Sequence, residues 1–125
     1  TSASTVEQRE HYLQIDGRKV FKFAVTKICA VVRDLAARHG MDIADIDLIV
    51  PHQANLRILE AAADRLGLRP DQLTTHVDRL GNTSSASIPI ALHEAVATGR
   101  IQPGHRVVLV GFGGGLSWGA ALIDW

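Results

Sequence analysis

The sequence predicts an α/β protein in which helices pack on a mixed sheet. Two kinds of segment alternate along it: stretches with apolar residues every three or four positions, and short aliphatic runs of strand length. The aliphatic runs at 46–50 and 106–110 are typical of strands covered on both faces, as in parallel sheets. A glycine run at 113–115 separates two extended segments and predicts an antiparallel hairpin, so the sheet should be mixed.

Composition narrows the classes of protein to which the chain can belong. Its 125 residues suit one domain with one core. The 13 Lys and Arg residues balance 13 Asp and Glu residues, so no overall charge favours nucleic acid or an anionic membrane as a partner. The single cysteine, Cys29, cannot form an internal disulfide or a thiolate metal site. We therefore expect a cytoplasmic protein without a bound metal. No apolar run reaches the ~18 residues of a membrane span.

The first half of the chain should contain one long and one shorter helix. Residues 1–14 form the expected connector, polar in its first ten residues, and 11–15 could add a short strand. The long helix follows Asp16-Gly17 and stops at His39-Gly40. Its apolar stripe consists of Phe21, Val25, Ile28, Val32 and Leu35. After the strand at 46–50, a second helix is expected from about Ala54 to Gly67.

The second half should continue the alternation and close with the hairpin. A short strand is expected at 74–78, followed by a turn-forming loop at 81–85. A third helix should run over 85–98, where Pro89 is tolerable only in the first turn. The strand at 106–110 then leads through the glycines to 116–125, whose small and apolar residues alternate with the period of a strand.

Three loops carry polar or glycine residues where packing does not require them, at 50–55, 81–87 and 111–115. Because the carboxyl ends of parallel strands meet at one edge of a sheet, His52 and the glycines should face one crevice, and Asn82 could join them. A neutral imidazole at a helix N-terminus and a carboxamide can both donate to one carbonyl oxygen as charge develops on it. Taken alone, such a histidine is more often structural than catalytic, and an asparagine after glycine is more often a turn residue.

Four strings in register give a more specific indication: VFKFAV at 20–25, VPHQANLRI at 50–58, DRLGNTSSASIPIAL at 78–92 and GFGGGLSWGAALI at 111–123. In order and spacing they resemble the C-terminal half of β-ketoacyl-acyl-carrier-protein synthase III, a condensing enzyme of the thiolase superfamily. The resemblance covers residues 15–125. It implies a thiolase-like domain with a mixed five-stranded sheet, and allows part of the first strand to lie upstream of Thr1, with 1–14 as the connector from a missing N-terminal half.

The resemblance implies roles for residues of the three loops. His52 and Asn82 match the family's catalytic His and Asn, which hold the malonyl thioester oxygen while carbon dioxide leaves. Gly114 matches the glycine whose N–H completes the oxyanion hole, and Phe112 an aromatic that lines the site. The nucleophilic Cys of the family lies in its N-terminal half, and the mid-helix Cys29 is no substitute. The 125 residues alone should therefore be inactive.

Further positions follow from the same resemblance. Residues expected beside the pantetheine tunnel of the coenzyme A thioester are Gly17, Phe21, Ala54, Asn55 and Ile58. Lys22 and Arg57 occupy positions at which the family meets phosphate groups or the acidic carrier protein, although either could be a solvated surface charge. Two departures from the usual family pattern, Ile15-Asp16-Gly17 and Leu116, leave the acyl-chain selectivity open.

The expected function is decarboxylative condensation of an acyl-CoA with malonyl-acyl-carrier-protein in fatty acid biosynthesis, by a homodimer that uses coenzyme A thioesters as substrates and no cofactor. One alternative is a starter-unit ketosynthase of polyketide or other secondary metabolism. Thiolases need a second reactive Cys near the glycine loop, and chalcone-type synthases usually carry GFGPG where this chain has GFGGG. A non-catalytic module that binds coenzyme A or a carrier protein is the alternative from a different class. It would not need His52, Asn82 and the glycine run together.

Overall fold

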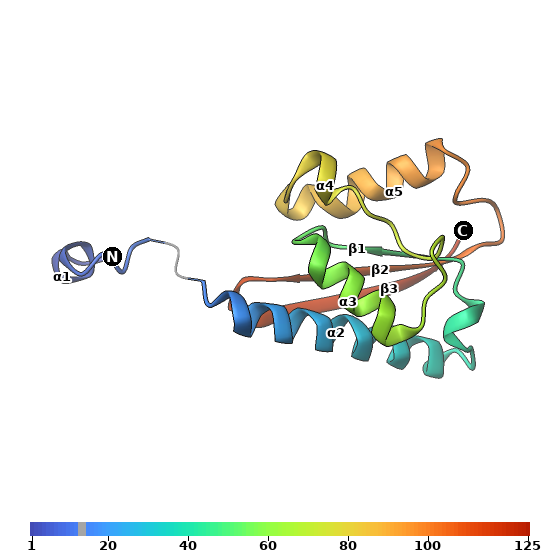
Figure 1. Cartoon of the computed structure of the whole chain (residues 1–125), viewed down its shortest axis with the longest axis horizontal. Coiled ribbons are helices and arrows are strands. Elements are labelled where there is room, and N and C mark those ends of the chain that lie inside the picture. The colour runs from blue at the N-terminus through green and yellow to red at the C-terminus, as the bar shows by residue number, and fades with distance from the viewer. Residues whose placement is uncertain (13–14) are drawn as a thin grey trace.

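The structure is a computed structural model that describes residues 1–12 and 15–125. The described residues form three strands and several helices (Figure 1). The helices are α1 (Ala3–Glu7), α2 (Gly17–Arg38), α3 (Leu56–Leu66), α4 (Val77–Leu80) and α5 (Ser87–Ala97). The strands are β1 (Leu48–Pro51), β2 (Arg106–Gly113) and β3 (Ser117–Asp124). Short 3-10 turns form at η1 (Ile43–Asp45), η2 (Ser84–Ala86) and η3 (Gly114–Leu116).

The strands form one mixed sheet in the order β1-β2-β3. β1 and β2 are parallel, with Leu48 opposite Val107 and Pro51 opposite Val110. β2 and β3 are antiparallel, and their pairing runs from Arg106 opposite Asp124 to Gly113 opposite Ser117. The predicted combination of a parallel pair and a C-terminal hairpin is confirmed. Since β2 extends three residues beyond Val110, it outruns β1 at the end where β1 leads into His52.

Helices cover both faces of the sheet (Figure 1). One face packs on α2 and α3 and presents Ile49, Val108 and Val110 to them. The other face presents Leu48, Val50 and Val107 to a second cluster that contains Ala91 and Ala95 of α5. All four residues of β1 are buried, as predicted for a strand covered on both sides. The predicted α/β architecture is therefore confirmed.

Helix α2 begins at a recognisable cap and buries or partly buries its predicted apolar stripe from Val25 to Leu35, whereas Phe21, the first residue of that stripe, is 39% exposed. The Asp16 carboxylate accepts hydrogen bonds from the backbone N–H groups of Arg18 and Lys19 and so starts α2. Its buried face includes Ile28, Val32 and Cys29. Burial raises the pKa of the Cys29 thiol more than the nearby Arg33 and Arg65 lower it, which fits an unreactive core residue. None of the helices in the described part of the chain combines the length and apolarity needed to cross a membrane.

The described sheet has three strands, where the resemblance implies five, and the predicted strand at 74–78 is wrong. Only Leu73 forms a bridge, to Ile49. The next backbone groups are taken by the buried Gln53 side chain: its Nε2 donates to the Thr74 carbonyl, and its Oε1 accepts from the N–H groups of His76 and Val77. With these groups engaged, the chain turns into α4 at Val77 and does not add a strand.

Element ends differ in smaller ways from the predictions. The expected connector includes the short helix α1, started by a capping box between Ser2 and Thr5, which the sequence analysis missed because α1 has no buried residue and no apolar period. The strand predicted at 11–15 includes residues 13 and 14, which lie outside the described residues, while 11, 12 and 15 are not in a strand. The helix predicted from Ser85 begins at Ser87, because η2 precedes it, and Pro89 lies in its first turn as required.

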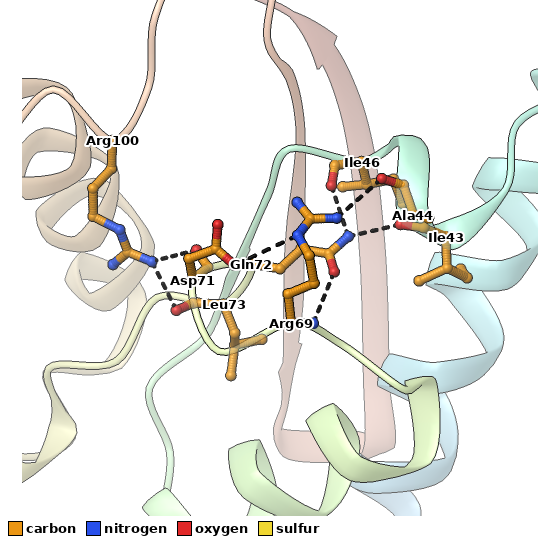
Figure 2. A network of polar contacts seen from close by, with 8 residues as sticks. All are labelled: Ile43, Ala44, Ile46, Arg69, Asp71, Gln72, Leu73 and Arg100. Atoms are coloured by element: carbon orange, nitrogen blue, oxygen red, sulfur yellow. Dashed lines mark hydrogen bonds and ion pairs between the residues drawn. The ribbon is translucent and has the colours of Figure 1, made fainter.

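A buried amide fixes the segment between α3 and α4 (Figure 2). Gln72 is 1% exposed, and its Nε2 donates to the carbonyls of Ile43 and Ile46, both at 2.7 Å, while its Oε1 accepts from the Arg69 backbone. Arg100 holds the same segment from the other side through the carbonyls of Asp71 and Leu73 (Figure 2). This network places Leu73 beside Ile49 and leads the chain toward the site.

Candidate active site

His52 follows β1 directly and is held from two sides. Its backbone N–H donates to the Val110 carbonyl at 2.7 Å, which continues the parallel pairing by one residue. Its side chain is half-buried, and Nδ1 lies 2.6 Å from Oγ of Ser87, the first residue of α5. The Phe112 ring and the imidazole form a T-shaped pair, with the ring centroids 5.1 Å apart and an interplanar angle of 68°. The imidazole therefore has a defined orientation at the end of the sheet.

Burial lowers the pKa of His52 below its ordinary value of 6.5, and the backbone of Ser84 opposes part of this shift. The imidazole is therefore neutral at neutral pH, as predicted, but for a different reason. The helix expected from Ala54 begins at Leu56, so its N-terminus is not adjacent to His52. Desolvation of the ring, and not the field of α3, disfavours the charged form.

Asn82 lies in the loop between α4 and η2, with an exposed side chain. Its Oδ1 accepts a hydrogen bond from the Ser84 backbone N–H at 2.9 Å. Ser84 itself adopts φ 52°, a left-handed conformation that is uncommon for a residue with a side chain. Nδ2 has no hydrogen-bond partner among the described residues, so it is the donor that Asn82 can offer to a ligand.

The glycine run forms the predicted turn of the hairpin. Gly114 begins η3, and Gly115 takes φ 71°, which glycine adopts without steric cost. The adjacent Leu116 also has positive φ, at 54°, and its side chain is half exposed. The part of β2 that extends beyond β1 carries Phe112 to His52 and places the glycine turn next to both.

One open cleft of about 1050 Å³ joins these elements. Of the residues that the sequence analysis assigned to the site, it is lined by His52, Ala54, Asn82, Phe112 and Gly114. The remainder of its wall comes mainly from the start of α2, from η2 and from the hairpin, including Asp16, Lys19, Val20, Phe23, Ser84, Ile88, Leu116 and Trp118. The predicted convergence of the three loops on one crevice is confirmed.

Six other assigned residues do not line this cleft. Ile58 is 4% exposed and packs in the core between α2 and α3. Asn55 is the N-cap of α3, and its Oδ1 accepts from the Arg57 N–H at 2.9 Å, which gives it a structural role. Gly17, Phe21, Lys22 and Arg57 are exposed on the first turns of α2 and α3. Their predicted contacts with pantetheine, phosphate or a carrier protein remain predictions.

The sequence analysis missed two contributors to the site. Trp118 of β3 lines the cleft, with Lys27 Nζ 3.7 Å from its ring centroid and Phe23 against its edge. Ser87, which contacts His52, precedes Ala91 and Ala95 at helical spacing on the buried face of α5. A serine at a buried helix position must have a hydrogen-bond partner, and that signal was available in the sequence.

Comparisons with known proteins show the family to which the chain is similar. Residues 36–125 match the family model described as 3-oxoacyl-[acyl-carrier-protein] synthase III C terminal. The chain is 54% identical over 114 residues to a β-ketoacyl-[acyl-carrier-protein] synthase III of Nitratidesulfovibrio vulgaris. This alignment covers 91% of this chain and 34% of that protein. Identity to the corresponding protein of Symbiobacterium thermophilum is 49%, over 99% of this chain and 38% of that one. The chain thus spans about a third of the length of these relatives.

Solved structures give the same result. The Thermus thermophilus β-ketoacyl-[acyl-carrier-protein] synthase III superposes with a TM-score of 0.86 at 52% identity, over 90% of this chain and 35% of that one. The priming β-ketosynthase of the R1128 polyketide pathway superposes with a TM-score of 0.79 at 37% identity, over 88% and 33% of the two chains. The family model, the identities and the thiolase-like fold agree: the chain belongs to the C-terminal family of 3-oxoacyl-[acyl-carrier-protein] synthase III.

Proposed function

We propose that this chain supplies the oxyanion-binding donors of a decarboxylative condensing enzyme that joins an acyl-CoA to malonyl-acyl-carrier-protein. The observation that carries the proposal is that one cleft is lined by both His52 and Asn82, with Nδ1 of His52 held by Ser87 and Oδ1 of Asn82 held by the Ser84 backbone. As malonyl loses carbon dioxide, negative charge accumulates on the thioester oxygen. Two preorganised N–H donors in a partly desolvated site stabilise that charge more in the transition state than in the substrate.

The remaining machinery is assigned to the part of the relatives that this chain does not cover. A nucleophilic Cys in that part would take the acyl group from coenzyme A. The backbone N–H of Gly114, which this chain supplies, would then bind the oxygen of the acyl-enzyme. Cys29 cannot serve as the nucleophile, because it is 2% exposed in the core and its Sγ contacts the Ala62 carbonyl. An acyl carrier protein, a homodimeric partner and a cytoplasmic location belong to the same proposal. We use the term complete enzyme for the polypeptide that contains both this chain and the part of the relatives that this chain does not cover.

A starter-unit ketosynthase is the second candidate, favoured by the similarity to the R1128 priming β-ketosynthase. The higher identities are to proteins named β-ketoacyl-[acyl-carrier-protein] synthase III, which supports the first candidate. Both candidates use the same chemistry at His52 and Asn82. They differ in the acyl group, so the acyl-CoA that labels the complete enzyme fastest distinguishes them.

The test of the shared chemistry separates its two half-reactions. His52→Ala in the complete enzyme should lower malonyl decarboxylation by about 100- to 1,000-fold, because one donor to the oxyanion is lost. Acyl transfer to the Cys should continue, as measured by the mass of the acylated protein. His39→Ala removes the exposed imidazole after α2, outside the cleft, and is the matched control. Equal loss of both half-reactions would reject the role proposed for His52.

A further inference from the structure

A buried hydroxyl lies behind the imidazole that lines the cleft. Ser87 is fully buried, with no exposed surface, and its Oγ lies 2.6 Å from Nδ1 of His52. It does not line the cleft. Of the side chains that line the cleft, His52 is the one that the Ser87 hydroxyl contacts among the described residues.

The hydrogen-bond inventory at Ser87 Oγ determines where its proton points. The Gln53 backbone N–H lies 3.2 Å from Oγ and can only donate, so it takes one lone pair of the oxygen. Among the described residues, the only other hydrogen-bond partner of Oγ is His52 Nδ1. If Nδ1 carried a proton, it would also donate to Oγ, and the hydroxyl proton would be buried without an acceptor. An unpaired buried donor is costly, which disfavours that arrangement.

We propose that Ser87 is a positioning residue that donates its hydroxyl proton to His52 Nδ1 and thereby fixes the imidazole as the tautomer protonated at Nε2. Since Nδ1 is occupied by a residue outside the cleft, Nε2–H is the remaining ring donor, available to a ligand in the cleft or to the Ser84 backbone that lines it. The opposite tautomer would present a lone pair there and would repel a developing oxyanion. The neutral ring can therefore act as a hydrogen-bond donor without becoming an imidazolium.

The surroundings hold Ser87 in place through both its side chain and its backbone. The Ser87 carbonyl lies 2.9 Å from Nε2 of the fully buried His76. The backbone N–H of His76 donates in turn to Oε1 of Gln53, whose own N–H donates to Ser87 Oγ. These contacts close a ring of Ser87, His76 and Gln53 directly behind His52. The position of the hydroxyl is thus set by two loops and by the start of α5, independently of any ligand.

The tautomer can be measured without turnover. The importance of the Nε2 donor rests on the proposed function, but the tautomer itself does not. In the complete enzyme labelled with ¹⁵N-histidine, we expect neutral His52 to show Nδ1 at the shift of an unprotonated ring nitrogen and Nε2 at that of a protonated one. His52→Gln identifies the signal by its disappearance. A wild-type spectrum with Nδ1 protonated would overturn the proposal, whatever the enzyme catalyses.

Substitution then tests the consequence. Ser87→Ala should move the two His52 nitrogen shifts toward each other as the tautomers mix, and should lower kcat for malonyl decarboxylation by about tenfold, with KM nearly unchanged. Thr74→Val is the matched control, since it removes a hydroxyl that is 3% exposed but does not contact His52. Unchanged His52 shifts in a folded Ser87→Ala protein would reject the proposal. Shifted nitrogens with unchanged decarboxylation would uphold the tautomer and reject the proposed function of His52.

Discussion

The carboxamide of Asn82 offers a sharp test of the site, because the structure separates its oxygen from its nitrogen. Oδ1 accepts from the Ser84 N–H, which orients the loop, and Nδ2 is available as the donor. Asn82→Asp keeps an acceptor of the same shape for Ser84 and replaces the donor with a carboxylate oxygen. The loop should therefore retain its conformation while the site loses one donor to the oxyanion.

The expected loss follows from that single exchange. Removing one oxyanion donor costs about 2.7–4 kcal/mol in the transition state, or about 100- to 1,000-fold in rate. The carboxylate also places a negative charge where negative charge develops, so the effect of Asn82→Asp should reach or exceed the upper end of this range. Acyl transfer to the nucleophile does not develop charge at that oxygen and should remain close to wild type.

The assay follows both half-reactions in the complete enzyme. Release of carbon dioxide from labelled malonyl-acyl-carrier-protein reports decarboxylation, and the mass of the acylated protein reports acyl transfer. Gln102→Glu makes the same exchange of amide for carboxylate on an exposed loop outside the cleft and serves as the control. Decarboxylation by Asn82→Asp at the rate of this control would show that Nδ2 does not donate to the oxyanion, and the reasoning would fail.

Two further predictions concern pH and stability. Decarboxylation requires neutral His52, whose pKa is lowered by burial, so the midpoint of the acid decline in a pH–rate profile should lie below the ordinary histidine value of 6.5. In Phe112→Ala, water reaches the ring and the pKa rises, so the midpoint should move to higher pH, whereas a wild-type midpoint above pH 6.5 would contradict this. Gln72→Leu leaves two carbonyls and one N–H of the network in Figure 2 without partners, so it should lower the free energy of unfolding, measured in urea, by about 2–4 kcal/mol. The control Gln102→Leu, at an exposed position, should change that free energy by less than about 0.5 kcal/mol, and similar values for both variants would refute the inferred role of the network.

The parts of the fold that depend on apolar periodicity were predictable from the sequence. The stripe of α2, the buried β1 and the glycine hairpin each follow from residues whose spacing matches their burial. The strand predicted at 74–78 failed because a polar side chain overrides the local preference there. Gln53 takes up the backbone groups of 74–77 and prevents the expected strand, and no local pattern indicates that a residue more than 20 positions away will do so.

The site divides in the same way. The convergence of His52, Asn82 and the glycine turn follows from the topology of a parallel sheet and was predictable before any coordinates. The resemblance also assigned Ile58 to a substrate tunnel; the structure packs this residue in the core, and its contact with pantetheine stays a prediction. Which nitrogen of His52 faces the cleft was beyond sequence reasoning, because it depends on a 2.6 Å contact with a residue 35 positions later.

Strand β2 extends beyond β1 by residues 111–113, which we call the arm, and the number of residues in this arm matters at the site as much as their identity. Side chains alternate between the two faces of a strand, and Phe112 shares its face with Val108 and Val110. A β-carbon at the preceding Gly111 would meet Ile88 of α5 at 3.8 Å, on the opposite side of the sheet. Inserting or deleting one residue in this arm would exchange these faces, directing the aromatic ring at α5 and leaving the imidazole without its neighbour. Inserting or deleting two residues would keep each side chain on its face but would move the turn along the strand axis. Natural differences in the length of the hairpin at this cleft should therefore occur at its turn and not within the arm.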